Sequence, residues 1–308
     1  VNVKTITEYE DNLKRTPTAI ERTLSLFNKY EIHATWAVVG FIFAKNKAEL
    51  ADFSPSSKPN YSNKKLSPYC YMENNNFIDN EFHFAPQIID QISRCKHQEI
   101  GTHTFSHYYC LENGQNPAEF SEDLSAAINI AKQKDISIKS LVFPRNQWND
   151  EYCSILNEQG ITSYRGNEKS WLYKPTNETG ESKIRRALRL ADSYINLSGS
   201  NSYTLASINS QAPFNIPSSR FLRPVSKKLS IFESLRKRRI IKDLIYAAKH
   251  NEVFHLWWHP HNFGNDVEKN ISFLEDILIV YAKMQKKYGM KSLNMEEISQ
   301  LTTGLNKS

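Results

Sequence analysis

Residues 21–40 read ERTLSLFNKYEIHATWAVVG and join a helix to a strand. The helix is predicted to begin at Thr16-Pro17, because threonine suits the cap and proline at the first helical position loses an N–H that would be unpaired anyway. Apolar residues then recur at helical spacing, at Ile20, Leu24 and Phe27. The run Ile32 to Val39 is β-branched and aromatic and ends at a glycine, which is typical of a buried strand. This stretch predicts one helix-to-strand step of a wound α/β fold.

The same alternation continues along the chain. Further helices are predicted at 85–95, 117–134, 150–159, 229–250 and 267–288. Further strands are predicted at 99–102, 140–143, 162–165, 253–258 and 291–294. Two stretches without clear periodicity, about 41–86 and 166–227, are expected to be insertions. Short strands separated by helices imply parallel pairing, either in a barrel or in an open sheet, within one α/β domain over residues 1–308.

Composition sets broad limits on the function. The 308 residues are 40% hydrophobic and 23% charged, which excludes a disordered or fibrous chain. The net charge of +6 is spread out, apart from the run Arg236 to Arg239, for which a solvated helix face is preferred over a contact with nucleic acid or anionic lipid. Four scattered cysteines favour reduced thiols in the cytoplasm. No apolar run approaches the roughly 20 residues of a membrane span, although association with a membrane surface stays open.

Two histidines follow the strand predicted at 99–102. In His103-Thr104-Phe105-Ser106-His107 the imidazoles stand four positions apart, so they meet on one side if the segment turns helically. Active sites of parallel α/β folds collect at strand ends, and imidazole is a common zinc ligand. A divalent metal site and a hydrogen-bonded loop pair are weighted equally at this point. No glutamate follows the first histidine, so the metalloprotease pattern H-E-x-x-H is not met.

A second group of histidines lies in residues 253–264, VFHLWWHPHNFG. Strand alternation places His255 and His259 on one face. His259 precedes the proline that ends the strand, so it can reach the edge where His103 lies. Histidine suits a group that gives up a proton near neutral pH. We expect His255 to be a hydrogen-bonded core residue, and His259 and His261 to be functional.

A third strand end carries Phe143-Pro144-Arg145-Asn146-Gln147-Trp148. Arg145 can hold a carboxylate through a bidentate pair, and a surface salt bridge is the alternative. The backbone N–H of Asn146 can help to bind an oxyanion. Tyrosines of the first insertion are natural platforms for sugar rings, and arginines of the second, Arg220 and Arg223, can meet an anionic group or form plain salt bridges. The candidate substrate contacts are Trp148, His261, Tyr61 and Arg220.

The order of these strand-end motifs resembles the polysaccharide deacetylase family, also called the chitooligosaccharide deacetylase homology domain. The resemblance covers about residues 13–40, 95–166 and 250–264, and MKSLNMEEIS near the C-terminus looks like the family's closing strand. HTFSH matches the family's H-x-x-x-H metal motif. The resemblance implies a distorted (β/α) barrel of mostly parallel strands.

The resemblance also implies roles for individual residues. His103 and His107 become ligands of a divalent metal, with Zn²⁺ as the first choice. Arg145 orients the catalytic base, and His259 is the general acid. Asp192 is the candidate for the aspartate that pairs with this histidine. The family's third motif continues with proline and an aromatic residue after the arginine, whereas Asn146-Gln147-Trp148 follows here.

The family's first motif is the largest departure. It supplies two aspartates, the general base and the third metal ligand, from a strand that precedes the helix at Thr16. Nothing in residues 1–15 has that pattern. We expect that the first strand of the barrel is missing from this chain, and an inactive relative is the alternative.

The resemblance predicts a metal-dependent, cytoplasmic hydrolase that removes an acetyl group from an N-acetylated sugar. The sugar is expected in a bacterial surface polysaccharide or its precursor, such as an oligosaccharide or a lipid-linked glycan. Two alternatives keep the scaffold: an amidase that acts on a small amide, and a relative that binds a glycan without chemistry. A nucleic-acid-binding protein that uses Arg236 to Arg239 is the alternative from another class.

Overall fold

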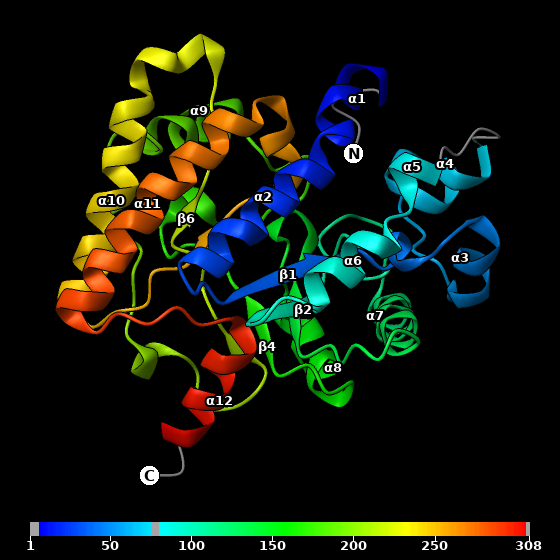
Figure 1. Cartoon of the computed structure of the whole chain (residues 1–308). Coiled ribbons are helices and arrows are strands. Elements are labelled where there is room, and N and C mark those ends of the chain that lie inside the picture. Colours follow the sequence, from blue (N-terminus) through cyan, green and yellow to red (C-terminus); the bar gives the residue numbers. More distant parts are fainter. Residues whose placement is uncertain (1–5, 75–79, 306–308) are drawn as a thin grey trace.

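A parallel five-stranded sheet forms the centre of the computed structural model, which describes residues 6–74 and 80–305 (Figure 1). Its strands follow the order β1 (Ala34–Val38), β2 (Gln98–Thr102), β3 (Ser140–Val142), β4 (Ser163–Arg165) and β5 (Phe214–Asn215). A second parallel sheet pairs β6 (Arg220–Phe221) with β7 (Leu256–Trp257). The parallel α/β fold predicted from the sequence is confirmed.

One segment, residues 214–222, joins the two sheets. The N–H groups of Phe214 and Ile216 donate to carbonyl oxygens of Thr162 and Tyr164, beside and within β4. Further along, the N–H of Leu222 donates to the carbonyl oxygen of Trp257 in β7. The strands therefore succeed one another around an incomplete barrel. Within residues 6–74 and 80–305, neither β1 nor β7 has a second strand beside it.

Helices cover this barrel at the positions that the sequence predicted. The predicted helices correspond to α2 (Thr16–Lys29), α6 (Pro86–Ser93), α7 (Pro117–Lys132), α8 (Cys153–Glu158), α10 (Glu233–His250) and α11 (Val267–Tyr288). The apolar face of α2 is buried through Ile20, Leu24 and Phe27. The long helices α10 and α11 lie side by side (Figure 1). No described helix combines the length and apolar character that crossing a bilayer requires.

The predicted insertions hold more regular structure than expected. The first contains α3 (Lys47–Phe53), α4 (Pro68–Asn74) and α5 (Asn80–His83), and the second contains α9 (Lys183–Asp192) together with β5 and β6. These elements are too short or too polar to show clear periodicity in the sequence. Short 3-10 helices complete the connections: η1 (Gly40–Phe43), η2 (Lys64–Leu66), η3 (Pro144–Asn146), η4 (Asp150–Tyr152), η5 (Trp171–Tyr173), η6 (Leu205–Ser207), η7 (Lys227–Phe232) and η8 (Pro260–Asn265).

The two ends of the described chain differ from the prediction. The predicted closing strand at 291–294 does not pair with another strand, and α12 (Met295–Leu305) follows it. The side-chain oxygen of Asn294 accepts the N–H of Glu297, so a cap begins a helix where a strand was expected. Near the N-terminus α1 (Ile6–Lys14) is a helix that packs against η8.

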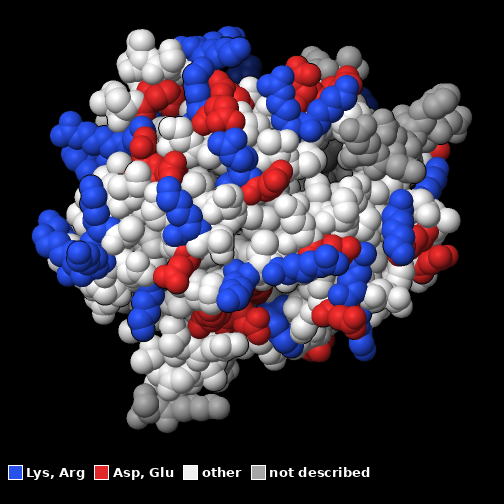
Figure 2. Space-filling view, in the orientation of Figure 1, with Lys and Arg blue, Asp and Glu red and all other residues white. Residues whose placement is uncertain are grey.

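The basic run of α10 is not a solvated face. Arg236 is buried, forms an ion pair with Glu233 and lies 4.0 Å from the ring centre of Phe273. Arg239 is buried and forms an ion pair with Asp243. On the face drawn in Figure 2, acidic side chains lie among the basic ones. The nucleic-acid alternative depended on exposed charges in this run, and these two arginines do not provide them.

A buried ionic network connects α9, β6 and α10. Arg220 donates from Nη1 to the Asp192 carboxylate at 2.5 Å and from Nη2 to the Asp243 carboxylate at 3.1 Å. Asp192 is fully buried and also accepts hydrogen bonds from the hydroxyls of Tyr173 and Ser198. The other oxygen of Asp192 accepts the N–H groups of Leu197 and Ser198, so both oxygens are engaged.

We predict that Asp192→Ala destabilises the protein strongly. The change would leave the buried Arg220 with half of its neutralising charge, and breaking such a pair costs about 3–5 kcal/mol. The free energy of unfolding in urea measures the loss. Asp276→Ala is the matched control, since Asp276 pairs with Lys237 at the surface and should cost less than about 1 kcal/mol. Equal losses in the two variants would contradict a structural role for Asp192.

Candidate metal and catalytic site

His103 and His107 lie together in the loop after β2. Their ring centres are 4.7 Å apart in an edge-to-face arrangement. From the sequence, the two rings were expected to meet if this segment formed a helical turn. The loop is not helical. Instead, Thr104 and His107 adopt left-handed backbone conformations, with φ of 64° and 61°. These two residues turn the chain back on itself, so the imidazoles meet by a different backbone path.

Asp123 of α7 fixes the shape of this loop. Its buried carboxylate accepts the backbone N–H groups of Phe105 at 2.8 Å and Ser106 at 3.2 Å. Burial raises the pKa of Asp123 to about 6, although these hydrogen bonds oppose the shift. Gly40 packs directly against this loop. A Cβ at position 40 would lie 2.4 Å from the Phe105 ring, so only glycine fits at that position.

The hydrogen bonds of the two imidazoles leave nitrogen lone pairs free. His103 Nδ1 lies 2.6 Å from the carbonyl oxygen of Val142, so it carries the proton and Nε2 keeps a lone pair. His107 Nδ1 is buried and has no hydrogen-bond partner among the described residues. Burial, followed by the charge of Arg165, lowers the pKa of His103 to about 3, and burial and His103 lower the pKa of His107 well below its usual value. Both rings are therefore neutral at pH 7.

A divalent cation fits this pair of donors, because zinc binds neutral imidazole nitrogen. A zinc site also needs further ligands. Among residues 6–74 and 80–305, no group of three or more histidine, cysteine, aspartate or glutamate side chains is arranged to hold a metal. The described part of the chain thus brings together two imidazoles but no third side chain of these types in a metal-binding arrangement.

His259 reaches the same region from the end of β7. Its ring stacks on His261 at 5.3 Å and lies 5.5 Å from the ring of Trp257. A charge on His259 would lower the pKa values of both His103 and His107, after the larger effect of burial on each, so His259 lies within electrostatic range of the pair. Burial, then His261 and Arg165, lowers the pKa of His259 to about 4. The resting imidazole is neutral.

The third strand end contributes Arg145 and Asn146. The guanidinium of Arg145 lies 4.5 Å from the ring centre of Tyr109 and 3.5 Å from the Glu112 carboxylate. The backbone N–H of Asn146 donates to the carbonyl oxygen of Phe143 at 3.0 Å. Because this N–H already donates to Phe143, it is not free to bind an oxyanion. The role predicted for it from the sequence is therefore wrong.

Several predicted residues have other surroundings. Tyr61 is buried, and its hydroxyl accepts the N–H of Tyr109 at 2.8 Å, so the expected exposed ring for a sugar is absent there. Trp148 packs at 6.0 Å against the ring of Tyr164. Asp192 and Arg220 pair with each other in the buried network, and the described contacts of His259 are with Phe221, Trp257 and His261 instead.

Arg165 belongs to the site but was not predicted. It ends β4, its guanidinium lies 4.0 Å from the ring centre of Trp257, and it donates to the side-chain oxygen of Asn146 at 2.6 Å. The sequence held a clue, since Arg165 closes a predicted strand just as His103 and Arg145 follow theirs. Asp123 lies within a helix, and nothing in the sequence marks it.

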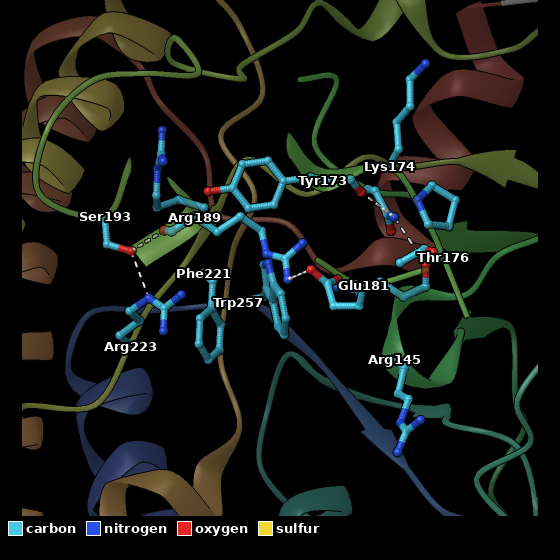
Figure 3. A pocket seen from close by; sticks show the side chains of 14 residues that line it. Arg145, Tyr173, Lys174, Thr176, Glu181, Arg189, Ser193, Phe221, Arg223 and Trp257 are labelled. Carbon is cyan, nitrogen blue, oxygen red and sulfur yellow. Dashed lines mark hydrogen bonds and ion pairs between the residues drawn. The ribbon is translucent and has the colours of Figure 1, made fainter. Parts of the chain in front are cut away.

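A cavity of about 190 Å³ lies beside these residues (Figure 3). Arg145 and Asn146 line one part of it, and Phe221, Arg223 and Trp257 line another. Since Trp257 also lies beside His259, the cavity adjoins the histidine cluster.

We predict that the buried histidines make the fold sensitive to acid, and His255 offers the cleanest test. Burial, then Arg165, lowers the pKa of His255 to about 4. Between pH 6.5 and 4 the unfolded chain therefore binds more protons than the folded chain, so the free energy of unfolding falls as the pH falls through this window. Replacing His255 by Asn keeps a donor for the carbonyl oxygen of Pro217 and removes this titration.

Urea unfolding at pH 7.5 and 4.5 measures the effect. His255→Asn should lose roughly 2–3 kcal/mol less than the wild type between the two pH values. The exposed His250 provides the control, and His250→Asn should follow the wild type. Identical pH dependence in all three proteins would show that His255 is not held neutral.

Comparison with known proteins shows which family the chain belongs to. Residues 8–164, half of the chain, match the sequence model of the family described as Polysaccharide deacetylase. None of the curated proteins matches the chain. A solved protein from Mycobacterium smegmatis, described as a polysaccharide deacetylase, has a similar fold, with a TM-score of 0.58 and 13% identity over 95% of this chain and 79% of that one.

Two further solved structures are more distant. A CE4 family pseudoenzyme from Bacillus anthracis has a TM-score of 0.45 and 11% identity over 92% of this chain and 61% of that one. Puue allantoinase has a TM-score of 0.48 and 13% identity over 94% and 74%. The family match covers the H-x-x-x-H motif and the end of β3, and it ends before His259. With the fold, the paired histidines and this match in agreement, the chain belongs to the polysaccharide deacetylase family.

Proposed function

We propose that this chain is a metal-dependent hydrolase that removes the acetyl group from an N-acetylated sugar of a bacterial surface polysaccharide or of its precursor. The observation that supports the proposal is the pairing of His103 with His107 after β2, with His259 near enough to influence the pKa of each. Family membership supports the reaction class. The four cysteines are free thiols, which supports action in the cytoplasm on a precursor glycan.

His103 and His107 are the proposed holders of the metal. A divalent ion held by these two residues would supply Lewis-acid polarisation of the acetamide carbonyl. Zinc is the preferred ion, because both donors are neutral imidazoles. The chain contributes a fixed tautomer at His103, through Val142, and a loop that Asp123 holds in place.

His259 is the proposed proton carrier. A neutral imidazole must gain a proton before it can donate one, and the pKa of about 4 keeps His259 neutral at rest. We propose that it receives the proton that the attacking water releases and passes it to the sugar nitrogen as the C–N bond breaks. One water is consumed, and acetate and a free amine leave.

A relative that binds a glycan without chemistry is the second candidate. It is favoured by one observation, the lack of a third metal-binding side chain near His103 and His107 in the described residues. Such a protein would bind sugar and release no acetate.

We predict that zinc binding depends on the two loop histidines. Protein incubated with Zn²⁺ and freed of excess by gel filtration should retain zinc, and His103→Ala and His107→Ala should each lose most of it. His255→Ala removes a nearby imidazole that the proposal does not use, and it should retain the metal. Chelation should abolish acetate release. Zinc content that is unaffected in both loop variants would rule out this pair as the ligands.

We predict that His259→Ala lowers the turnover number by about 10²- to 10⁴-fold, which is the contribution of a general acid or base. Acetate release from a panel of N-acetylated sugars measures turnover, and circular dichroism verifies folding. His250→Ala is the control on the protein surface. Unchanged turnover would remove His259 from the mechanism, and zinc-bound wild type that binds sugar without releasing acetate would support the second candidate.

A further inference from the structure

The cavity beside Trp257 is rich in cationic side chains. Its basic lining residues are Arg145, Lys174, Arg189, Arg220 and Arg223. Glu181 also lines the cavity. In Figure 3, Arg189 and Arg223 lie near the rings of Phe221 and Trp257, whereas Arg145 and Lys174 lie farther from them. Whether this charge is available to a ligand depends on which of the arginines the protein itself neutralises.

Two of the arginines are already neutralised. Arg220 forms ion pairs with two buried aspartates. Arg189 forms an ion pair with Glu181 at 2.9 Å. Arg145 has only the long contact of 3.5 Å with Glu112.

Arg223 differs from these residues. Its Nε donates to the hydroxyl of Ser193 at 2.8 Å, and its guanidinium lies 5.7 Å from the ring centre of Phe221. No carboxylate of the described chain lies within ion-pair distance of Arg223. Burial lowers its pKa, as expected for a charge that lacks a counter-ion.

Arg165 is a second guanidinium without an ion pair, and it lies over the ring of Trp257. It is 9% exposed, and no described carboxylate lies within ion-pair distance. Its neighbour Glu168 instead accepts the indole N–H of Trp257 at 3.4 Å. Trp257 thus contacts a buried positive charge and also lines the cavity.

We propose that this cavity binds an anionic group of the acetylated sugar, a phosphate or a carboxylate, with Arg223 as its main partner. The inference rests on the proposed function and names its substrate class. A guanidinium presents paired N–H donors that match these two oxyanions. Enclosing a charge without a partner is costly, so a site that keeps one is prepared for a ligand of opposite charge.

The position of the cavity suits an anionic group close to the reacting acetamide. Trp257 and Phe221 line the cavity, and their rings lie 5.5 and 5.7 Å from the ring of His259. The volume of about 190 Å³ accommodates a charged substituent rather than a length of glycan chain. A sugar held through its anionic group would lie across Trp257 with its acetamide toward the histidines.

Calorimetry with the full-length chain tests the inference. The probes are N-acetylglucosamine 1-phosphate, which bears a phosphate, N-acetylmuramic acid, which bears a carboxylate, and neutral N-acetylglucosamine. At least one charged sugar should bind ten-fold or more tightly than the neutral sugar, and the stronger one identifies the anion. Arg223→Met should weaken that binding by about 10- to 100-fold, the range for a hydrogen bond to a charged group, and leave the neutral sugar unaffected.

Arg186→Met is the matched control, since it removes the same charge from an exposed position of α9, the helix that also carries Arg189. It should leave all three affinities unchanged. Arg223→Met should also be at least as stable as the wild type without ligand, because no ion pair is lost. A purely structural arginine would instead destabilise the protein when replaced.

Equal affinity for charged and neutral sugars would overturn the inference, as would equal effects of the two methionine variants on the charged sugar. Binding needs neither a bound metal nor turnover, so this test separates the two proposals. Tight binding of a charged sugar without acetate release would retain the cavity assignment and reject the hydrolase. Acetate release without preference for charge would do the reverse.

Discussion

The hydrogen bonds from the loop after β2 to Asp123 are the constraint on which the rest of the site depends. Asp123 accepts the N–H groups of Phe105 and Ser106 inside the core, and this holds Thr104 and His107 in left-handed conformations. Without that turn the two imidazoles would point apart along the chain. Val142 then fixes the tautomer of His103 from the neighbouring strand. The fold thereby fixes the positions of both imidazoles and the tautomer of His103 in the absence of a ligand.

The electrostatics of the site follow from where its charges are neutralised. Asp192 and Asp243 are paired with Arg220 and Arg239, and Glu181 is paired with Arg189, whereas Arg165 and Arg223 have no ion pair among the described residues. Positive charge and burial together keep His103, His107 and His259 neutral. Such an environment favours bound negative charge, from a metal-binding carboxylate, from a substrate anion or from an oxyanion formed during the reaction.

Much of the barrel was predictable, because its strands and long helices repeat their apolar spacing over enough residues. The helix at 267–288 was predicted to the residue, while α9 and β5 were missed within a polar stretch. The predicted closing strand failed because a local cap at Asn294 outweighs extended pairing. At the site, strand-end position led to the prediction that His103 and His259 lie near one edge of the sheet, and the effect of His259 on the pKa of His103 is consistent with it. The sequence could not show that Asp192 pairs with Arg220, because that contact depends on the tertiary fold. Nor could it show that Tyr61 is buried.

Diffraction from zinc-soaked crystals, recorded on both sides of the zinc absorption edge, tests the central claim most directly. The account predicts one strong anomalous peak within coordination distance of His103 Nε2 and of a nitrogen of His107. It also predicts that this peak adjoins the cavity of Trp257. A peak located elsewhere, or the absence of zinc at this pair in crystals of protein that releases acetate, would contradict it.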